Sequence, residues 1–153
     1  MQNTMNPEEK FKTDLLRRYK KDMHLKFFNE DASRQYVKIP IFSKLSPKKQ
    51  LIPFRNTECQ KSSCVYDIQD IVDKFKDSQM SSMSGFICYS CNKFVELQKF
   101  FLDIALKKII DHIWERFNKI DKIICNGVTV MRDGHWEPNL PEYLSMNMSY
   151  LLT

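Results

Sequence analysis

The stretch FICYSCNK, residues 86–93, holds two cysteines that are separated by two residues. A second pair lies upstream in the stretch CQKSSC, residues 59–64. Two thiolates on one tight turn can bind a tetrahedral zinc ion together with a second pair, and the metal then orders the loops that carry them. We therefore predict a zinc site built from both pairs: Cys59, Cys64, Cys88 and Cys91. The alternative is two buried structural thiols and two surface thiols.

The composition limits the kind of protein. The chain has 153 residues, of which 42% are apolar and only three are glycine. This is enough for one domain with a core, but so few glycines speak against phosphate-binding loops. With no signal segment and no run near the ~20 apolar residues of a membrane span, we expect a soluble, intracellular protein without a membrane partner. In a reducing compartment paired cysteines favour metal over disulfides, and Cys125 is expected to be a buried thiol.

The formal charge of +5 is concentrated in one segment. Residues 37–57 contain five basic side chains and no acidic one: Lys38, Lys44, Lys48, Lys49 and Arg55. Such a cluster can contact nucleic acid or an acidic protein surface. The candidate contact residues are Lys44, Lys48, Lys49 and Arg55. The alternative is a solvated loop and an edge strand whose lysines discourage pairing with other chains.

Hydrophobic periodicity predicts a long N-terminal helix over residues 6–28. Asn6 can cap this helix, and Pro7 suits its first turn. Apolar residues then recur at every fourth position from Phe11 to Phe27. The resulting stripe fits either a helix that packs on its own domain or an arm that docks on a protein partner.

Shorter elements are predicted downstream. Residues 36–42 and 50–55 are expected to form a hairpin, with Pro40 placing the first strand at a sheet edge. The remaining predictions are helices over residues 67–77 and 96–117, a strand from Phe86 into the cysteine turn, a hairpin over residues 121–131 across Asn126-Gly127, and a turn at Asp133-Gly134.

The order of these motifs resembles the SP-RING (MIZ-type) zinc finger of PIAS/Siz-type SUMO ligases. That family's pattern runs C-P-L, P-C-R, C-x-H-x-x-C, W-x-C-P-x-C-x-K and an acidic-Gly-x-Trp turn. The matching stretches here are SKL (43–45), PFR (53–55), CQKSSC (59–64), FICYSCNK (86–93) and DGHWEP (133–138). The resemblance implies an α+β, RING-like zinc domain of short β-hairpins and helices. Its expected division is a helical arm (1–36), the zinc domain (37–138) and a C-terminal tail (139–153).

The resemblance also implies the metal ligands. In the family, zinc is held by the first cysteine, the histidine two residues later and the C-x-x-C pair. Lys61 stands at the histidine position, and a protonated lysine has no lone pair for zinc. A four-cysteine site that Cys64 completes is the first hypothesis. A three-cysteine site with a water is the second, and loss of the metal is the third.

The function implied by the resemblance is that of a nuclear SUMO ligase-like adaptor. Such an enzyme has no catalytic side chain; it binds a SUMO-conjugating enzyme charged with SUMO and accelerates transfer by positioning the thioester. The family docks this enzyme through the apolar residue of C-P-L, here Leu45, and the turn at the C-x-x-C pair, here Tyr89.

The departures from the family pattern suggest an alternative function. Ser43 and Lys44 replace the Cys and Pro of C-P-L. The alternative is therefore a catalytically degenerate SP-RING that serves as an interaction subunit of a larger complex. The N-terminal helix would then contact a protein partner, and the basic segment 38–55 would contact nucleic acid.

Overall fold

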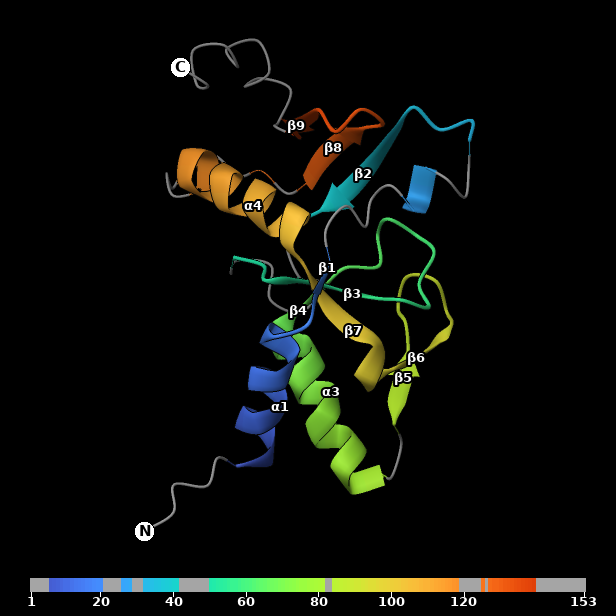
Figure 1. Cartoon of the computed structure of the whole chain (residues 1–153), viewed down its shortest axis with the longest axis vertical. Coiled ribbons are helices and arrows are strands. Elements are labelled where there is room, and N and C mark those ends of the chain that lie inside the picture. The colour runs from blue at the N-terminus through green and yellow to red at the C-terminus, as the bar shows by residue number, and fades with distance from the viewer. Residues whose placement is uncertain are drawn as a thin grey trace.

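The computed structural model describes residues 6–20, 26–28, 32–41, 50–81, 84–118, 125 and 127–139 (Figure 1). These residues form a small α+β domain with short strands, which confirms the predicted fold class. The helical elements are α1 (Pro7–Leu16), α3 (Ile68–Ser81), α4 (Ile104–Ile113), the 3-10 turn η1 (Leu97–Lys99) and the π-helical turn η2 (Trp114–Asn118). The strands are β1 (Tyr19–Lys20), β2 (Tyr36–Pro40), β3 (Pro53–Asn56), β4 (Tyr66–Asp67), β5 (Gly85–Ile87), β6 (Phe94–Glu96), β7 (Phe100–Asp103), β8 (Gly127–Met131) and β9 (Trp136–Pro138).

The strands form three sheets in the described part of the chain. A four-stranded sheet has the order β1-β7-β3-β4, with β1 parallel to β7 and the other neighbours antiparallel. A three-stranded antiparallel sheet has the order β2-β8-β9, and β5 pairs with β6. Figure 1 shows α4 beside the three-stranded sheet, while α1 and α3 lie side by side at the opposite end of the four-stranded sheet.

Two hydrophobic cores join these layers. The first lies between α4 and the sheet β2-β8-β9 and contains the buried residues Val37, Ile110 and Val130. The second lies against α1 and α3 and contains Leu15, Ile71 and three of the paired cysteines. Each large aliphatic side chain that is fully buried contributes about 1.5–3 kcal/mol.

No helix of the described residues has the length and apolar character needed to span a membrane.

The N-terminal helix is shorter than predicted. Asn6 caps it by accepting a hydrogen bond from the backbone N–H of Glu9 at 2.8 Å, but the helix ends at Leu16. The chain then extends as β1, where the carbonyl of Arg18 accepts a 2.7 Å hydrogen bond from the backbone of Leu102. The prediction of one helix to residue 28 is therefore wrong, because the apolar stripe serves two cores: Leu15 lies in the second and Phe27 in the first.

The strands predicted over residues 36–42 and 50–55 are present but do not form a hairpin. The first is β2, which ends at Pro40 at the edge of its sheet as predicted. The second is β3, which lies inside the four-stranded sheet between β7 and β4. The predicted hairpin is wrong because β2 pairs with β8 instead, across a long stretch of sequence.

The helix predicted over residues 96–117 is also shorter. Its first part forms η1 and then β7, because the apolar run Phe100–Leu102 pairs with β3. The helix α4 begins at Ile104, and Asp103 caps it by accepting a 3.0 Å hydrogen bond from the backbone of Leu106. By contrast, the helix predicted over residues 67–77 is confirmed as α3, which continues to Ser81.

The predicted hairpin across Asn126-Gly127 is wrong. β8 begins at Gly127, and both of its edges are occupied, by β2 and β9. The hairpin of this region is β8–β9, and the predicted turn at Asp133-Gly134 connects it, with Gly134 at a positive φ of 96°. Residues 121–124 and Asn126 lie outside the described residues.

Candidate metal centre

The two cysteine pairs meet in one place. The first pair lies on the loop between β3 and β4, and the second lies on the turn between β5 and β6. The four sulfur atoms all lie within 4.8 Å of one another: Cys59, Cys64, Cys88 and Cys91. Cys91 is partly exposed, and the other three are buried. The grouping predicted from the spacing is confirmed.

The sulfur distances fit a tetrahedral metal. The Sγ atoms of Cys64 and Cys88 are 3.7 Å apart, and those of Cys59 and Cys91 are 3.8 Å apart. A tetrahedral zinc ion with Zn–S bonds of about 2.3 Å places its ligand sulfurs about 3.8 Å apart. The donor set is therefore suited to one zinc ion held by four thiolates. Cys64, whose position is not a zinc ligand in the SP-RING pattern, belongs to this group of four sulfur atoms.

The second pair is held by a tight turn. The backbone N–H of Asn92 donates to the carbonyl of Cys88 at 2.9 Å, and Asn92 adopts a positive φ of 61°. The hairpin before it requires a glycine, because a Cβ on Gly85 would lie 2.0 Å from the carbonyl oxygen of Val95. These constraints direct the second pair of thiols back toward the first pair. The predicted strand that runs into the cysteine turn is confirmed as β5.

The first pair is held from inside by Arg55. Its guanidinium donates to the carbonyls of Ser62 at 3.1 Å and Cys64 at 3.4 Å. Its Nε donates to the carboxylate of Asp103 at 2.8 Å. Its Cζ atom lies 4.8 Å from the centre of the Phe27 ring. Arg55 therefore connects the cysteine loop to the start of α4 and to the N-terminal segment.

The prediction that Arg55 contacts an acidic partner is wrong. The residue is 1% exposed, and its charge is paired with Asp103, which is 0% exposed. Burial lowers the pKa of the Arg55 guanidinium, and the Asp103 carboxylate opposes that shift. The other predicted contact residues of the segment lie outside the described residues: Lys44, Lys48 and Lys49, as does the predicted docking residue Leu45.

Lys61 links the two cysteine loops. Its side chain is exposed, and its Nζ donates to the carbonyl of Ser90 at 3.3 Å. A hydrogen bond between the hydroxyls of Ser63 and Ser90 joins the same loops. Lys61 therefore connects the loop of the first cysteine pair to the turn of the second. From the sequence, Lys61 indicated only that the histidine of the SP-RING pattern is absent; its contact with Ser90 was not predicted.

Tyr89 is partly exposed on the turn of the second pair. Its phenol donates to the carbonyl of Val65 at 2.7 Å, and its ring packs edge-on against Tyr66 at 4.8 Å. Burial raises the pKa of Tyr89 to about 12. Ile87 and Phe94, which pair across β5 and β6, are 58% and 44% exposed. Sequence reasoning missed these two residues, although apolar residues that flank a cysteine turn on paired strands could have indicated them.

The thiols of the cluster shift one another's pKa values in opposite directions. Hydrogen bonds to Cys64 and Cys88 raise the pKa of Cys59. The pKa of Cys88 is lowered by hydrogen bonds from the thiols of Cys59 and Cys64. Lys26 donates to the carbonyl of Cys59 at 3.2 Å, and Lys61 donates to the carbonyl of Ser90 on the other cysteine loop. Cys125, in contrast, lies apart in the first core, where burial raises its pKa and its thiol donates to the Gly127 carbonyl, as expected of a structural thiol.

The fold is similar to two solved structures. One is the SUMO E3 ligase Siz2 of S. cerevisiae, with a TM-score of 0.64 and 13% identity over 88% of this chain and 48% of that chain. The other is the SUMO E3 ligase Siz1 of S. cerevisiae, with a TM-score of 0.61 and 13% identity over 89% of this chain and 45% of that chain. No protein-family model matches the sequence, and no curated protein matches it. The chain thus shares a fold with these ligases and spans about half of their length.

Proposed function

We propose that this chain is a SUMO ligase-like adaptor. It binds a SUMO-conjugating enzyme charged with SUMO and promotes transfer of SUMO to a target lysine. The observation that carries the proposal is the convergence of two cysteine loops in one centre, within a fold similar to that of two SUMO E3 ligases. The same reasoning favours a nuclear protein, since its partners would belong to the SUMO pathway.

Zinc is the proposed cofactor, and its role is structural. The residues that would hold it are Cys59, Cys64, Cys88 and Cys91. A centre with four protein ligands has no open position for a substrate, so the metal supplies folding free energy and not Lewis-acid chemistry. The metal would fix the position of the turn that carries Tyr89 relative to the loop that carries Lys61.

The chain's own residues would act by positioning. Holding a reactive thioester near an amine converts a bimolecular step into an effectively unimolecular one, without a protein nucleophile. Tyr89 remains the proposed contact on the cysteine turn, supported by its partial exposure and by its 2.7 Å bond to Val65, which fixes its orientation. Leu45 remains the proposed second contact. The division into an arm, a zinc domain and a tail also stays a proposal.

A second candidate function is a catalytically degenerate interaction subunit. The observation that favours it is the use of Tyr89, at the position of the family's proline, to close the turn against Val65. A bulky aromatic there changes the shape of the surface that would receive the conjugating enzyme. In this case a protein partner would bind through the N-terminal segment, and nucleic acid would bind through Lys44, Lys48 and Lys49.

Discharge of a SUMO thioester separates the two candidates. Zinc-loaded protein is added to a SUMO-conjugating enzyme charged with SUMO, and loss of the thioester to free lysine is followed over time. The ligase proposal predicts faster discharge that Leu45→Ala and Tyr89→Ala abolish while the bound zinc is retained. Lys108→Ala, on the exposed face of α4, is the matched control. No acceleration at any protein concentration would overturn the ligase proposal and favour the interaction subunit.

A further inference from the structure

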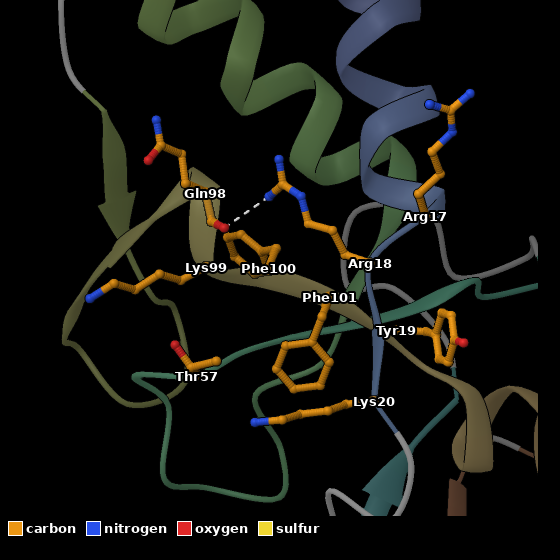
Figure 2. A pocket seen from close by; sticks show the side chains of 9 residues that line it. All are labelled: Arg17, Arg18, Tyr19, Lys20, Thr57, Gln98, Lys99, Phe100 and Phe101. Atoms are coloured by element: carbon orange, nitrogen blue, oxygen red, sulfur yellow. Dashed lines mark hydrogen bonds between the residues drawn. The ribbon is translucent and has the colours of Figure 1, made fainter.

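A hollow of about 480 Å³ opens beside the first cysteine loop (Figure 2). Three segments line it: residues 17–20 between α1 and the end of β1, Thr57 after β3, and residues 98–101 from η1 into β7. Phe100 and Phe101 both belong to this lining, and the Phe101 ring lies beside Lys20, whereas the Phe100 ring packs into the second core against Phe86. Tyr89 and the four paired cysteines are not among the described residues that line this hollow.

The described residues of the lining are basic or neutral, and none of them is acidic. Four cationic side chains take part: Arg17, Arg18, Lys20 and Lys99. Lys99 already pairs with Glu58 and Glu96, and Arg18 donates to the carbonyl of Gln98 at 2.9 Å. Arg17 and Lys20 have no carboxylate partner among the described residues, so the hollow keeps an uncompensated positive charge.

Lys20 is an exposed residue of the lining whose side chain is held against an aromatic ring. Its Nζ lies 5.5 Å from the centre of the Phe101 ring, and Figure 2 shows the side chain extended along that ring. Such a contact holds the ammonium group in place and leaves its hydrogen-bond donors available to a ligand. A negatively charged group in the hollow would find Lys20 and Arg17, both exposed, in its lining.

Exposed apolar side chains and an edge strand lie next to the hollow. Tyr19 is 63% exposed and Leu16 is 46% exposed, on either side of the two arginines. β1 is the outer strand of its sheet and has only two residues. An outer strand offers backbone groups to an extended peptide, and exposed apolar side chains offer it contacts between the charges.

These features favour an acidic peptide over nucleic acid. A nucleic acid needs a continuous positive track for its phosphates. Here the positive lining is short, since Glu58 and Glu96 stand beside Lys99 at one end and Asp14 lies on the last turn of α1 at the other. A peptide with a few carboxylates and an aromatic side chain between them matches the small basic hollow, which also offers the exposed Tyr19 and the Phe101 ring beside Lys20.

We propose that this hollow is a docking site for a short acidic segment of a partner protein. Arg17 and Lys20 contact the carboxylates of the segment, and Tyr19 and the edge of Phe101 contact its apolar side chain. The site is independent of the metal centre and of SUMO transfer, and it would provide selection of a partner.

Fluorescence anisotropy tests the site with the zinc-loaded full chain. The probe is a fluorescein-labelled peptide with the sequence Asp-Phe-Glu-Phe-Asp-Glu, and the neutral control peptide has Asn and Gln at the acidic positions. We expect Lys20→Glu and Arg17→Glu each to weaken binding of the acidic peptide by about tenfold, because attraction becomes repulsion at each site. The matched control Lys108→Glu makes the same change of charge on α4 and is expected to leave binding unchanged.

The proposal would be overturned if the acidic peptide did not bind at low salt, or if the neutral peptide bound equally well. It would also be overturned if Lys108→Glu weakened peptide binding as much as the variants of the hollow do. Tighter binding of an oligothymidylate that displaces the peptide would instead indicate a nucleic-acid site. Lys20→Gln is a milder variant for use if charge reversal disturbs folding, which circular dichroism would reveal. Thioester discharge is measured on the same variants. If these variants lose peptide binding but still accelerate thioester discharge, the peptide site is separate from the proposed ligase function.

Discussion

The buried pair of Arg55 and Asp103 is the most consequential interaction for which sequence analysis gave no indication. Both side chains are almost fully buried, and the pair links the first cysteine loop to the cap of α4. Replacing Arg55 by Met keeps much of its length and removes its charge. The change leaves the Asp103 carboxylate buried without its cation and leaves the loop carbonyl of Ser62 without its donor.

The size of the effect can be worked out from these contacts. Removing one member of a buried ion pair costs about 3–5 kcal/mol, because the remaining charge is uncompensated. Each loop hydrogen bond contributes about 1 kcal/mol more. One nitrogen of Arg55, Nη2, has no hydrogen-bond partner among the described residues, which reduces the net contribution of the arginine. We therefore expect Arg55→Met to lower the free energy of unfolding by about 4 kcal/mol.

A double-mutant cycle measures the pair itself. Urea unfolding of the zinc-loaded protein is compared for Arg55→Met, Asp103→Asn and the double variant. Asn at position 103 can still accept the capping bond from Leu106, so the second variant isolates the charge. We expect the double variant to be more stable than the sum of the single effects predicts, by about 2 kcal/mol. Additivity within about 0.5 kcal/mol would refute the assignment of Arg55 as the electrostatic link between the cysteine loop and α4.

Three further predictions follow from the metal centre. Cys64→Ser is expected to lose bound zinc as completely as Cys59→Ser, measured by elemental analysis after dialysis; retention of zinc by Cys64→Ser would instead favour a three-cysteine site. Removal of zinc with a chelator is expected to lower the unfolding midpoint in urea, because metal binding supplies folding free energy, and an unchanged midpoint would count against a structural metal. Gly85→Ala is expected to destabilise the protein by about 1–3 kcal/mol, because its Cβ would overlap Val95 in the β5–β6 hairpin, and thermal unfolding measures this.

Local signals predicted the elements that stand next to the centre. The spacing of Cys88 and Cys91 indicated the turn, and the apolar pattern after Asp67 indicated α3. These predictions succeeded because a knuckle and an amphipathic helix are each determined by a few neighbouring residues. The cysteine grouping also succeeded, since the spacing of the two pairs fitted a single metal site.

Long-range pairing could not be predicted in the same way. The apolar run at Phe100 fits a helix or a strand equally well, and its pairing with β3 decides between them. Likewise, β2 pairs with β8 from the far end of the domain, and nothing in either stretch identifies the other. Arg55 was assigned to the surface because it belongs to a basic segment, whereas its burial depends on Asp103, which lies 48 residues away.

An all-thiolate centre has an electrostatic consequence that accounts for the lysines around it. Replacing a neutral histidine ligand by a thiolate adds one negative charge to the centre, and a buried charge needs compensation. Lys61 stands where the SP-RING pattern has a histidine, and its ammonium donates to the Ser90 carbonyl on the second cysteine loop. Lys26 approaches from the opposite segment at the carbonyls of Thr57 and Cys59. In the proposed four-cysteine site, Cys64 would add a negative charge as a ligand, and Lys61, which cannot bind zinc, would offset that charge.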